Sequence, residues 1–332
     1  MEESKVPVTI ITGFLGAGKT TLINYVLTEN HGKKIAVIEN EFGKAIEIEG
    51  AMMVKDENNQ QEWIELPNGC ICCAVKDDLL LTVENLVKRR KDKLDHIFIE
   101  PSGLADPGAL ASIFWVDSEV DTNVYLDAII TVVDAKHILQ HLEDDSRLDN
   151  QAPVSEAHSQ IASADRIIVN KLDLIDSEQL SHLKRRIRGV NAAAPLLCVE
   201  RSKVPLDDIL NINAYSISER QELEEKPCEE GHDGHCDHDH HRIHNPQVTT
   251  IFIEESKPLD LSKFRLWLGE LLWQQDSEKE IPIDIFRCKG QVYAHGEEER
   301  WMLQGVHTLF ELEASGDRVD YSSSAKASTK RH

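Results

Sequence analysis

The chain has 332 residues, with 36 Lys and Arg against 59 Asp and Glu, which gives a formal net charge of −23. So negative a chain excludes nucleic acid as its main partner, because the phosphate backbone would repel it. A hydrophobic content of 41% excludes disorder throughout, and no apolar run reaches the roughly 18 residues of a membrane span. The N-terminus has no secretory signal, so we expect a cytoplasmic protein away from membranes, with the nucleus as the alternative location.

Short apolar segments rich in Ile and Val alternate with amphipathic stretches from Val8 onward. This alternation predicts an α/β fold with a doubly wound, mostly parallel sheet. The expected strands are 8–11, 34–38, 63–66, 95–99, 126–133, 166–169 and 196–199, and the clearest helices are 21–27 and 77–90.

The composition changes at residues 219–247, which are acidic, rich in His and almost free of apolar side chains. Such a segment cannot bury a core and is predicted to be a linker. A strand at 248–253, a helix at 261–275 and strands near 283–289, 301–303 and 306–312 then predict a second, smaller α+β domain. We therefore expect a first domain at 1–218, the linker at 219–247, the second domain at 248–315 and a polar tail at 316–332.

A phosphate-binding motif follows the first predicted strand. Residues 13–20 match G-x-x-x-x-G-K-[ST] and precede a helix, as a P-loop requires, which leaves a chance glycine-rich turn as the weak alternative. Lys19 should reach the β- and γ-phosphates, and the Thr20 hydroxyl should bind Mg²⁺. The residues expected to contact the nucleotide are Gly13, Phe14, Leu15, Gly16, Ala17, Gly18, Lys19, Thr20 and Thr21.

A second motif indicates which base is bound. Asn170, Lys171 and Asp173 form an Asn-Lys-x-Asp box directly after the predicted strand 166–169. A carboxylate at Asp173 can accept hydrogen bonds from two guanine donors that adenine lacks, so GTP is favoured over ATP. An Asx-rich turn is the alternative reading of this box. Residues 201–204 are a weaker candidate for the base pocket.

Two carboxylates are candidates for sensing the γ-phosphate. Glu100 ends the predicted strand 95–99 and suits a water-mediated Mg²⁺ contact. Glu41 lies in the loop 40–43 after the second strand, where a solvated loop carboxylate is an equally good explanation. We assign Lys19, Thr20, Glu41 and Glu100 to catalysis.

Three of the seven cysteines form a candidate metal site at Cys70, Cys72 and Cys73. Three thiolates from one short loop can occupy three corners of a tetrahedron around Zn²⁺, which leaves the fourth corner for a carboxylate, water or a receiving protein. An incomplete set suits a transferable ion, and buried packing thiols are the alternative. In the linker, we expect loose metal binding by six further histidines: His232, His235, His238, His240, His241 and His244.

The motifs at 13–20, 40–43, 69–73, 100–107 and 170–173 together resemble the CobW-like metallochaperone GTPases. The stretches 114–119 and 304–312 are similar to the eukaryotic zinc-regulated GTPase metalloprotein activator branch of that family. The resemblance covers about residues 5–315, and it implies a P-loop GTPase fold with a CobW-like C-terminal domain at 248–315.

The resemblance also implies a function, that of a GTPase acting as a zinc transferase. Its cofactors would be GTP, Mg²⁺ and Zn²⁺, and it would hand zinc to a client apo-metalloenzyme, in this branch a type I methionine aminopeptidase. Relatives in the branch carry an N-terminal Cys-Pro-Glu-Leu-Val-Pro-like docking segment that this sequence lacks, so we expect a shortened form or a different client. A non-catalytic zinc buffer and a Ni²⁺ or Co²⁺ delivering GTPase are the alternatives.

Overall fold

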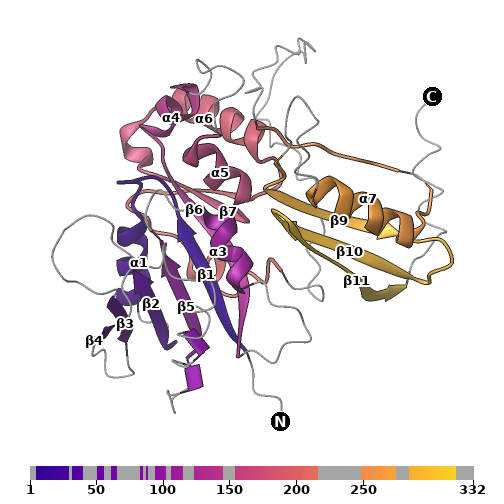
Figure 1. The fold of residues 1–332 in the computed structure, drawn as a ribbon. Helices are drawn as coiled ribbons and strands as arrows, with labels where there is room; N and C mark the ends of the chain where they lie inside the picture. The colour runs from indigo at the N-terminus through magenta and orange to yellow at the C-terminus, as the bar shows by residue number, and fades with distance from the viewer. Residues whose placement is uncertain are drawn as a thin grey trace.

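An eight-stranded sheet forms the centre of the first domain (Figure 1). The computed structural model describes residues 5–29, 32–39, 51–55, 61–65, 83–84, 87–88, 94–101, 106–114, 123–144, 154–215, 248–255, 257–273 and 284–318. The strands are β1 (Val6–Thr12), β2 (Ile35–Glu39), β3 (Ala51–Lys55), β4 (Gln61–Glu65), β5 (His96–Glu100), β6 (Val124–Asp134), β7 (Arg166–Asn170) and β8 (Leu196–Cys198).

The order of the strands confirms the predicted fold class. The sheet runs β4-β3-β2-β5-β1-β6-β7-β8, and its neighbours from β2 to β8 pair in parallel. β3 pairs antiparallel with both β2 and β4. The sequence did not lead us to predict β3, and β4 is antiparallel to its only described neighbour. A parallel sheet places the carboxyl ends of its strands at one edge, which is where the predicted loops meet.

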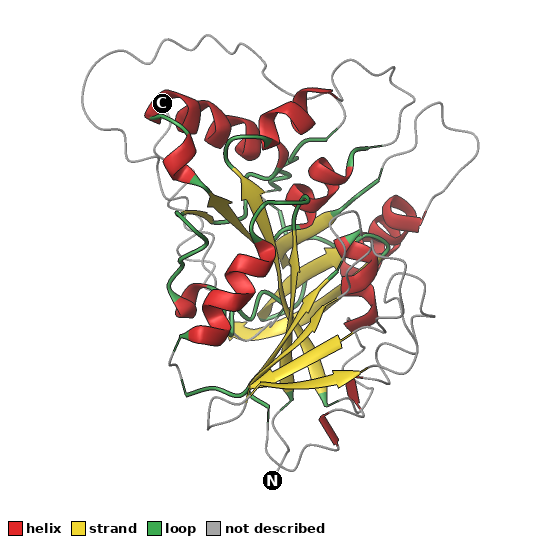
Figure 2. Ribbon diagram, turned by 90° about the vertical axis from the view of Figure 1, so that its left-hand side faces the viewer, coloured by secondary structure: helices red, strands yellow, loops and turns green. Residues whose placement is uncertain are grey.

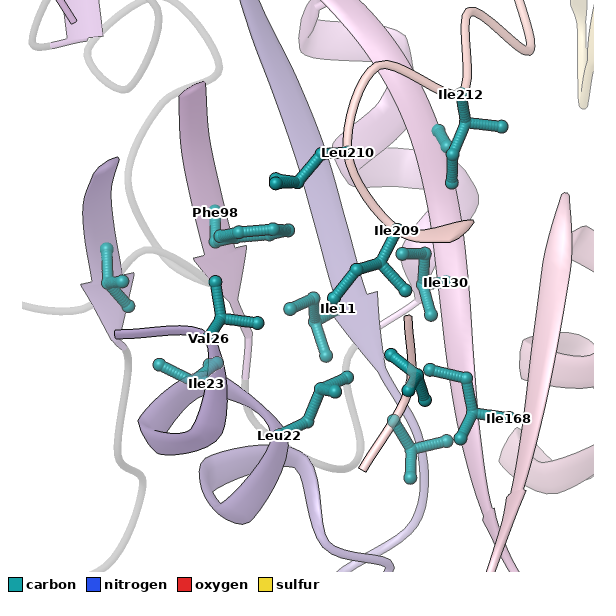
Figure 3. Close-up of a cluster of buried hydrophobic side chains, with 14 of the residues drawn as sticks. Ile11, Leu22, Ile23, Val26, Phe98, Ile130, Ile168, Ile209, Leu210 and Ile212 are labelled. Carbon is teal, nitrogen blue, oxygen red and sulfur yellow. The ribbon is translucent and has the colours of Figure 1, made fainter. Parts of the chain in front are cut away.

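Alternate residues of each buried strand face opposite sides of the sheet, and helices cover both sides (Figure 2). Val8 and Ile10 of β1 pack in one core with α3 (Pro107–Phe114), whereas Ile11 packs in another core with α1 (Lys19–Thr28). Figure 3 shows this second core, in which Val26 of α1 lies near Phe98 of β5 and Leu22 lies near Ile11 of β1. The remaining helices of the domain are α4 (Ile138–Asp144), α5 (Glu156–Ser163), α6 (Ser177–Val190) and the 3-10 helices η2 (Leu172–Leu174) and η3 (Leu206–Asp208).

The second domain is an antiparallel sheet of three strands with one helix against it (Figure 1). Its elements are α7 (Leu261–Trp273), β9 (Arg287–Tyr293), β10 (Glu299–Val306) and β11 (Leu309–Arg318). The predicted face of α7 is confirmed, because Leu261, Phe264, Leu268 and Leu271 all pack in one core with the sheet.

The predicted strand at 248–253 is wrong. Val248 is buried in the core of the first domain, and the Thr250 hydroxyl donates to the carbonyl oxygen of Val190 at 3.1 Å. Ile251, Phe252 and Ile253 are 76%, 79% and 76% exposed, without the pairing that defines a strand. The apolar run has β propensity, but propensity is overridden where no neighbouring strand supplies hydrogen bonds.

Several predictions fall outside the described residues. They are the loop 40–43, the cysteine loop 69–73, the linker 219–247 and most of the predicted helix 77–90. The parts of that helix that are described, 83–84 and 87–88, are helical. Of the predicted tail 316–332, the first three residues belong to β11 and the rest lie outside the described residues. No helix within the described parts of the chain is long and apolar enough to cross a bilayer.

A buried ionic cluster joins the two domains. Asp165, whose side chain is 1% exposed, lies 2.6 Å from a guanidinium nitrogen of Arg287 and 2.9 Å from Nζ of Lys289. Arg287 also stacks over the ring of Tyr215 at 4.1 Å. Burial raises the pKa of Asp165, but the two cations outweigh it and hold that pKa below its ordinary value.

Asp165→Asn should destabilise the protein by about 3 kcal/mol, because it leaves two partly buried cations without their anion. Urea unfolding at neutral pH measures the effect, with the exposed Asp284→Asn as the matched control. The pKa of Asp165 is depressed in the folded state, so its contribution is present above the unfolded value of about 3.9 and is lost as pH falls through the lower folded value. A variant as stable as the control, or with an unchanged pH dependence, would contradict this account.

Candidate functional site

The P-loop connects the end of β1 to the start of α1 at the carboxyl edge of the sheet. Its three glycines have left-handed or otherwise positive φ angles, 138° at Gly13, 77° at Gly16 and 109° at Gly18. A Cβ at Gly13 would collide with the carbonyl oxygen of Val132 in β6, so the loop also needs glycine there for close approach. Leu15 at the crest of the loop is 83% exposed.

Lys19 lies inside the loop, in the position from which a P-loop lysine reaches phosphate oxygens. Its Nζ donates to the carbonyl oxygen of Gly13 at 2.9 Å and lies 3.9 Å from a carboxylate oxygen of Glu100. Burial lowers the pKa of Lys19, and the Glu100 charge partly opposes that shift. The cation is therefore held between backbone and carboxylate at the point where a polyphosphate would enter.

Thr20 and Glu100 bring together two oxygen donors suited to Mg²⁺. The Thr20 hydroxyl donates to the two carboxylate oxygens of Glu100 at 3.3 and 3.4 Å. Mg²⁺ prefers hydroxyl, carboxylate and phosphate oxygens, so the chemistry of this donor set fits the ion. Glu100 reaches the P-loop because β5, which it ends, lies directly beside β1.

Asn170 ties the base-binding box to the P-loop. It ends β7 and is almost fully buried, and its amide nitrogen donates to the carbonyl oxygen of Ala17 at 3.0 Å. Its amide oxygen accepts from the backbone N–H of Ser202 at 2.8 Å. Ser202 in turn donates through its hydroxyl to the carbonyl oxygen of Gly18 at 3.0 Å. A Cβ at Gly18 would collide with the side chains of Asn170 and Ser202, so this junction also requires glycine.

Ser202 is therefore a residue whose importance the sequence signalled only weakly. It is fully buried, and Arg201 and Ser202 both adopt left-handed backbone angles, with φ of 52° and 55°. Non-glycine residues adopt this conformation rarely, and two in succession mark a specialised turn. The signal available in the sequence was only the position of 201–204 after the β8 strand.

Lys171 and Asp173 follow Asn170 on the exposed side of this junction. Lys171 has a left-handed φ of 66°, and its Nζ lies 2.7 Å from Oδ2 of Asp134, the last residue of β6. Asp173 lies in η2 and is exposed, as a carboxylate that reads a base must be. Sequence reasoning did not select Asp134, although a polar residue at the end of an apolar strand was the signal that selected Glu100.

Asp134 also organises the turn in which it lies. Its Oδ1 accepts from the backbone N–H of Lys136 at 2.9 Å, and its Oδ2 lies 3.0 Å from Nδ1 of His137. Burial raises the pKa of Asp134, but the contacts with Lys171, His137 and the Lys136 N–H outweigh it and lower that pKa. Asp134 is thus an anion that holds the side chain of Lys171 in place within the box.

Asp134→Asn should weaken GTP binding about fivefold while leaving kcat nearly unchanged. The amide keeps an acceptor for the Lys136 N–H but loses the charge that holds Lys171. Loss of that contact should cost about 1 kcal/mol of binding free energy, which corresponds to a fivefold change in affinity. Fluorescent-nucleotide titration measures the change. In a double-mutant cycle with Lys171→Ala, the Asp134 substitution should add no further loss. Additive losses would show that the two side chains do not act together.

The other predicted site residues lie outside the described residues: Glu41, Cys70, Cys72 and Cys73. In the described parts of the chain, no group of three or more His, Cys, Asp or Glu side chains could hold a metal ion. The predicted zinc site on the cysteine loop therefore stays a prediction.

Models of two known protein domains match most of this chain. Residues 7–198 match the family model described as CobW/HypB/UreG, nucleotide-binding domain, and residues 248–327 match the Cobalamin synthesis protein cobW C-terminal domain. The chain belongs to the CobW family of P-loop GTPases. This confirms the resemblance that the motifs indicated, and the GTP-binding character of the fold follows from membership of that family.

Relatives of the CobW family match most of the chain. It is 34% identical over 94% of its length to the Zinc-regulated GTPase metalloprotein activator 1 of Saccharomyces cerevisiae, of which it covers 76%. It is 36% identical over 93% of its length to the Zinc chaperone CobW of Pseudomonas aeruginosa, of which it covers 82%. Among solved structures, Zn(II)-bound YjiA GTPase from Escherichia coli matches with a TM-score of 0.68 at 29% identity, covering 95% of this chain and 90% of that one.

Proposed function

We propose that this protein is a GTP-hydrolysing zinc chaperone. The observation that carries the proposal is the junction of P-loop, Glu100 and the Asn170 box at one edge of the sheet. Relatives that cover most of the chain are named as a zinc chaperone and as a zinc-regulated GTPase metalloprotein activator, which supports zinc as the cargo. Neither observation identifies the client, for which a type I methionine aminopeptidase is our candidate.

In this proposal the residues at the carboxyl edge of the sheet bind the nucleotide. The backbone of 13–18 wraps the phosphates, Lys19 moves from the Gly13 carbonyl to the β- and γ-phosphates, and Asp173 accepts from guanine. Thr20 and Glu100 would hold Mg²⁺, which offsets the negative charge of the phosphates when it is bound. Glu100, with Glu41 from the second loop, would orient the water that attacks the γ-phosphate to give GDP and phosphate.

Zinc is the cargo of the proposed reaction and would lie on Cys70, Cys72 and Cys73. The cysteine loop follows β4 in the chain and precedes β5, whose last residue Glu100 contacts the P-loop. Nucleotide exchange can therefore bias the zinc ligands through neighbouring loops. By linkage, if GTP tightens zinc binding, zinc must tighten GTP binding by the same factor.

Zinc affinity should be about 5- to 150-fold higher with a non-hydrolysable GTP analogue than with GDP, the range of a typical coupling free energy. Chelator competition measures it, with Cys72→Ser as the variant that removes tight zinc. GTP turnover and transfer of zinc to an apo-metalloenzyme are followed on the same preparation. Equal zinc affinity in both nucleotide states would contradict the coupling, and zinc binding without multiple turnover of GTP would favour the zinc buffer. Tighter binding of Ni²⁺ or Co²⁺ than of Zn²⁺ would favour the third alternative.

A further inference from the structure

The turn between β10 and β11 reaches from the second domain to the start of α3 in the first (Figure 1). Val306, at the end of β10, is fully buried in the core that also holds Leu110 and Phe114 of α3. His307 follows it with a left-handed φ of 51°. The motif 304–312, which the proposed function leaves without a role, is the segment that makes this contact.

His307 contacts the first turn of α3 in two ways. Its Nε2 lies 3.5 Å from Oδ1 of Asp106, and that same oxygen accepts from the backbone N–H of Gly108 at 2.9 Å. Its ring lies against Gly108, where any Cβ would collide with it. Burial raises the pKa of Asp106, but the His307 contact and the Gly108 and Ala109 amides outweigh it and lower that pKa. Nε2 of His307 and the Gly108 N–H therefore both face the same carboxylate oxygen of Asp106.

The second domain holds His307 in place. The indole nitrogen of Trp273, at the end of α7, donates to the carbonyl oxygen of Thr308 at 2.7 Å. The backbone N–H of His307 donates to the carbonyl oxygen of Phe286 at 3.4 Å, and the Phe286 ring lies edge-on to the imidazole at 5.5 Å. The turn is thus attached both to α7 and to Phe286, the residue before β9. Because of these contacts, the turn should move together with the rest of the second domain.

The first turn of α3 is in turn connected to the nucleotide site. Asp106 comes six positions after Glu100, whose carboxylate accepts from Thr20 in the P-loop. Leu110 of α3 also packs in one core with Val8 and Ile10 of β1, the strand that leads into the P-loop. A shift of the start of α3 would therefore alter the placement of Glu100 or of β1.

We propose that His307 is a positioning residue for GTP hydrolysis, which acts from the second domain by fixing Asp106 and the start of α3 relative to Glu100. The inference rests on the proposed function, because it needs GTP turnover at this site. It deepens that function by giving the C-terminal domain a defined influence on the hydrolytic step. Glu100 is needed for turnover rather than for holding the base and phosphates, so kcat should change more than KM.

His307→Ala should lower kcat for GTP about five- to tenfold and leave KM within about twofold, as expected for the loss of one polar contact to a charged group. His307→Gln retains an N–H donor and should recover most of the turnover. The matched control is His295→Ala, an exposed histidine of the same domain in the turn between β9 and β10. Equal kcat in wild type, His307→Ala and His295→Ala would overturn the inference.

Gly108→Ala tests the same contact from the other side. Alanine favours a helix over glycine, so a fall in kcat would come from displacement of the His307 ring. In the His307→Ala background the collision is relieved, so Gly108→Ala should cause no further fall in kcat there. A further fall in kcat in that background would contradict the inference. If thermal unfolding shows that His307→Ala does not fold, Gly108→Ala in the otherwise wild-type protein decides the matter alone, and a kcat equal to that of the wild type would overturn the inference.

The same assay separates this inference from the proposed function. Wild-type protein that turns over GTP and transfers zinc, with no response to any of these variants, would overturn the role of His307 alone. Wild-type protein that does not turn over GTP would overturn the proposed function, and the inference with it.

Discussion

Lys19→Ala should reduce GTP turnover by about 100- to 1,000-fold, the typical cost of removing one preorganised group that stabilises developing charge. The Nζ of Lys19 lies between the Gly13 carbonyl and the Glu100 carboxylate, within a loop whose three glycines have positive φ angles. In the transition state, charge spreads over the oxygens of the transferred phosphoryl group, and this cation would lie against them.

The matched control is Lys184→Ala, an exposed lysine of α6 that lies outside the site. Turnover is measured by phosphate release under saturating GTP and Mg²⁺, and nucleotide affinity by titration with GDP. Burial lowers the pKa of Lys19, so removing the cation also relieves a desolvation cost, and the folded state should not be destabilised greatly. A variant with the turnover of the Lys184→Ala control would remove Lys19 from the catalytic group.

The sequence is most informative where a site is built from residues close together in the chain. The P-loop is one such segment, so its strand, glycines, lysine and helix could all be predicted before the structure. Asn170 and Glu100 could also be predicted as site residues, because each ends a buried strand and the loops that follow parallel strands lie at one edge of the sheet.

Contacts that join distant segments could not be predicted in the same way. Asp134 and Lys171 are 37 positions apart and meet only because β6 and β7 are neighbours in register. Ser202 contacts Gly18 across 184 positions, through a backbone conformation that the residue type does not suggest. The same holds for His307, since a motif that identifies a family branch does not say which helix it touches.

Two errors concern local propensity. The run Ile251, Phe252 and Ile253 has the apolar character of a strand but pairs with none, and β3 was not predicted although it pairs with two. Both cases depend on the availability of a neighbour, which a short apolar segment does not encode. The domain limits at 218, 247 and 315 and the zinc ligands stay predictions.

Asp173→Asn should lower the affinity for GTP about 100-fold and shift preference towards xanthosine triphosphate. Guanine presents two donors, N1–H and the exocyclic amine, and a carboxylate can accept from both. Each such hydrogen bond to a charged group contributes about 1.5 to 3 kcal/mol, so losing the charge and one acceptor accounts for that factor. The Asn side chain would offer an N–H₂ group towards the exocyclic amine, donor against donor.

Xanthine carries a carbonyl oxygen where guanine carries that amine, so the side-chain amide that Asp173→Asn introduces would find an acceptor in it. The expected result in a competition titration is therefore a reversal, with the wild type preferring GTP over both ATP and xanthosine triphosphate and the variant preferring the xanthine nucleotide. Asp207→Asn is the matched control, because it changes another exposed aspartate in a 3-10 helix, η3, that follows the sheet. Since Asn170 rather than Asp173 ties the box to the P-loop, the variant should keep its fold and its hold on the phosphates. Equal affinity of the wild type for ATP and GTP, or an Asp173→Asn variant that discriminates as the control does, would show that the base is read elsewhere.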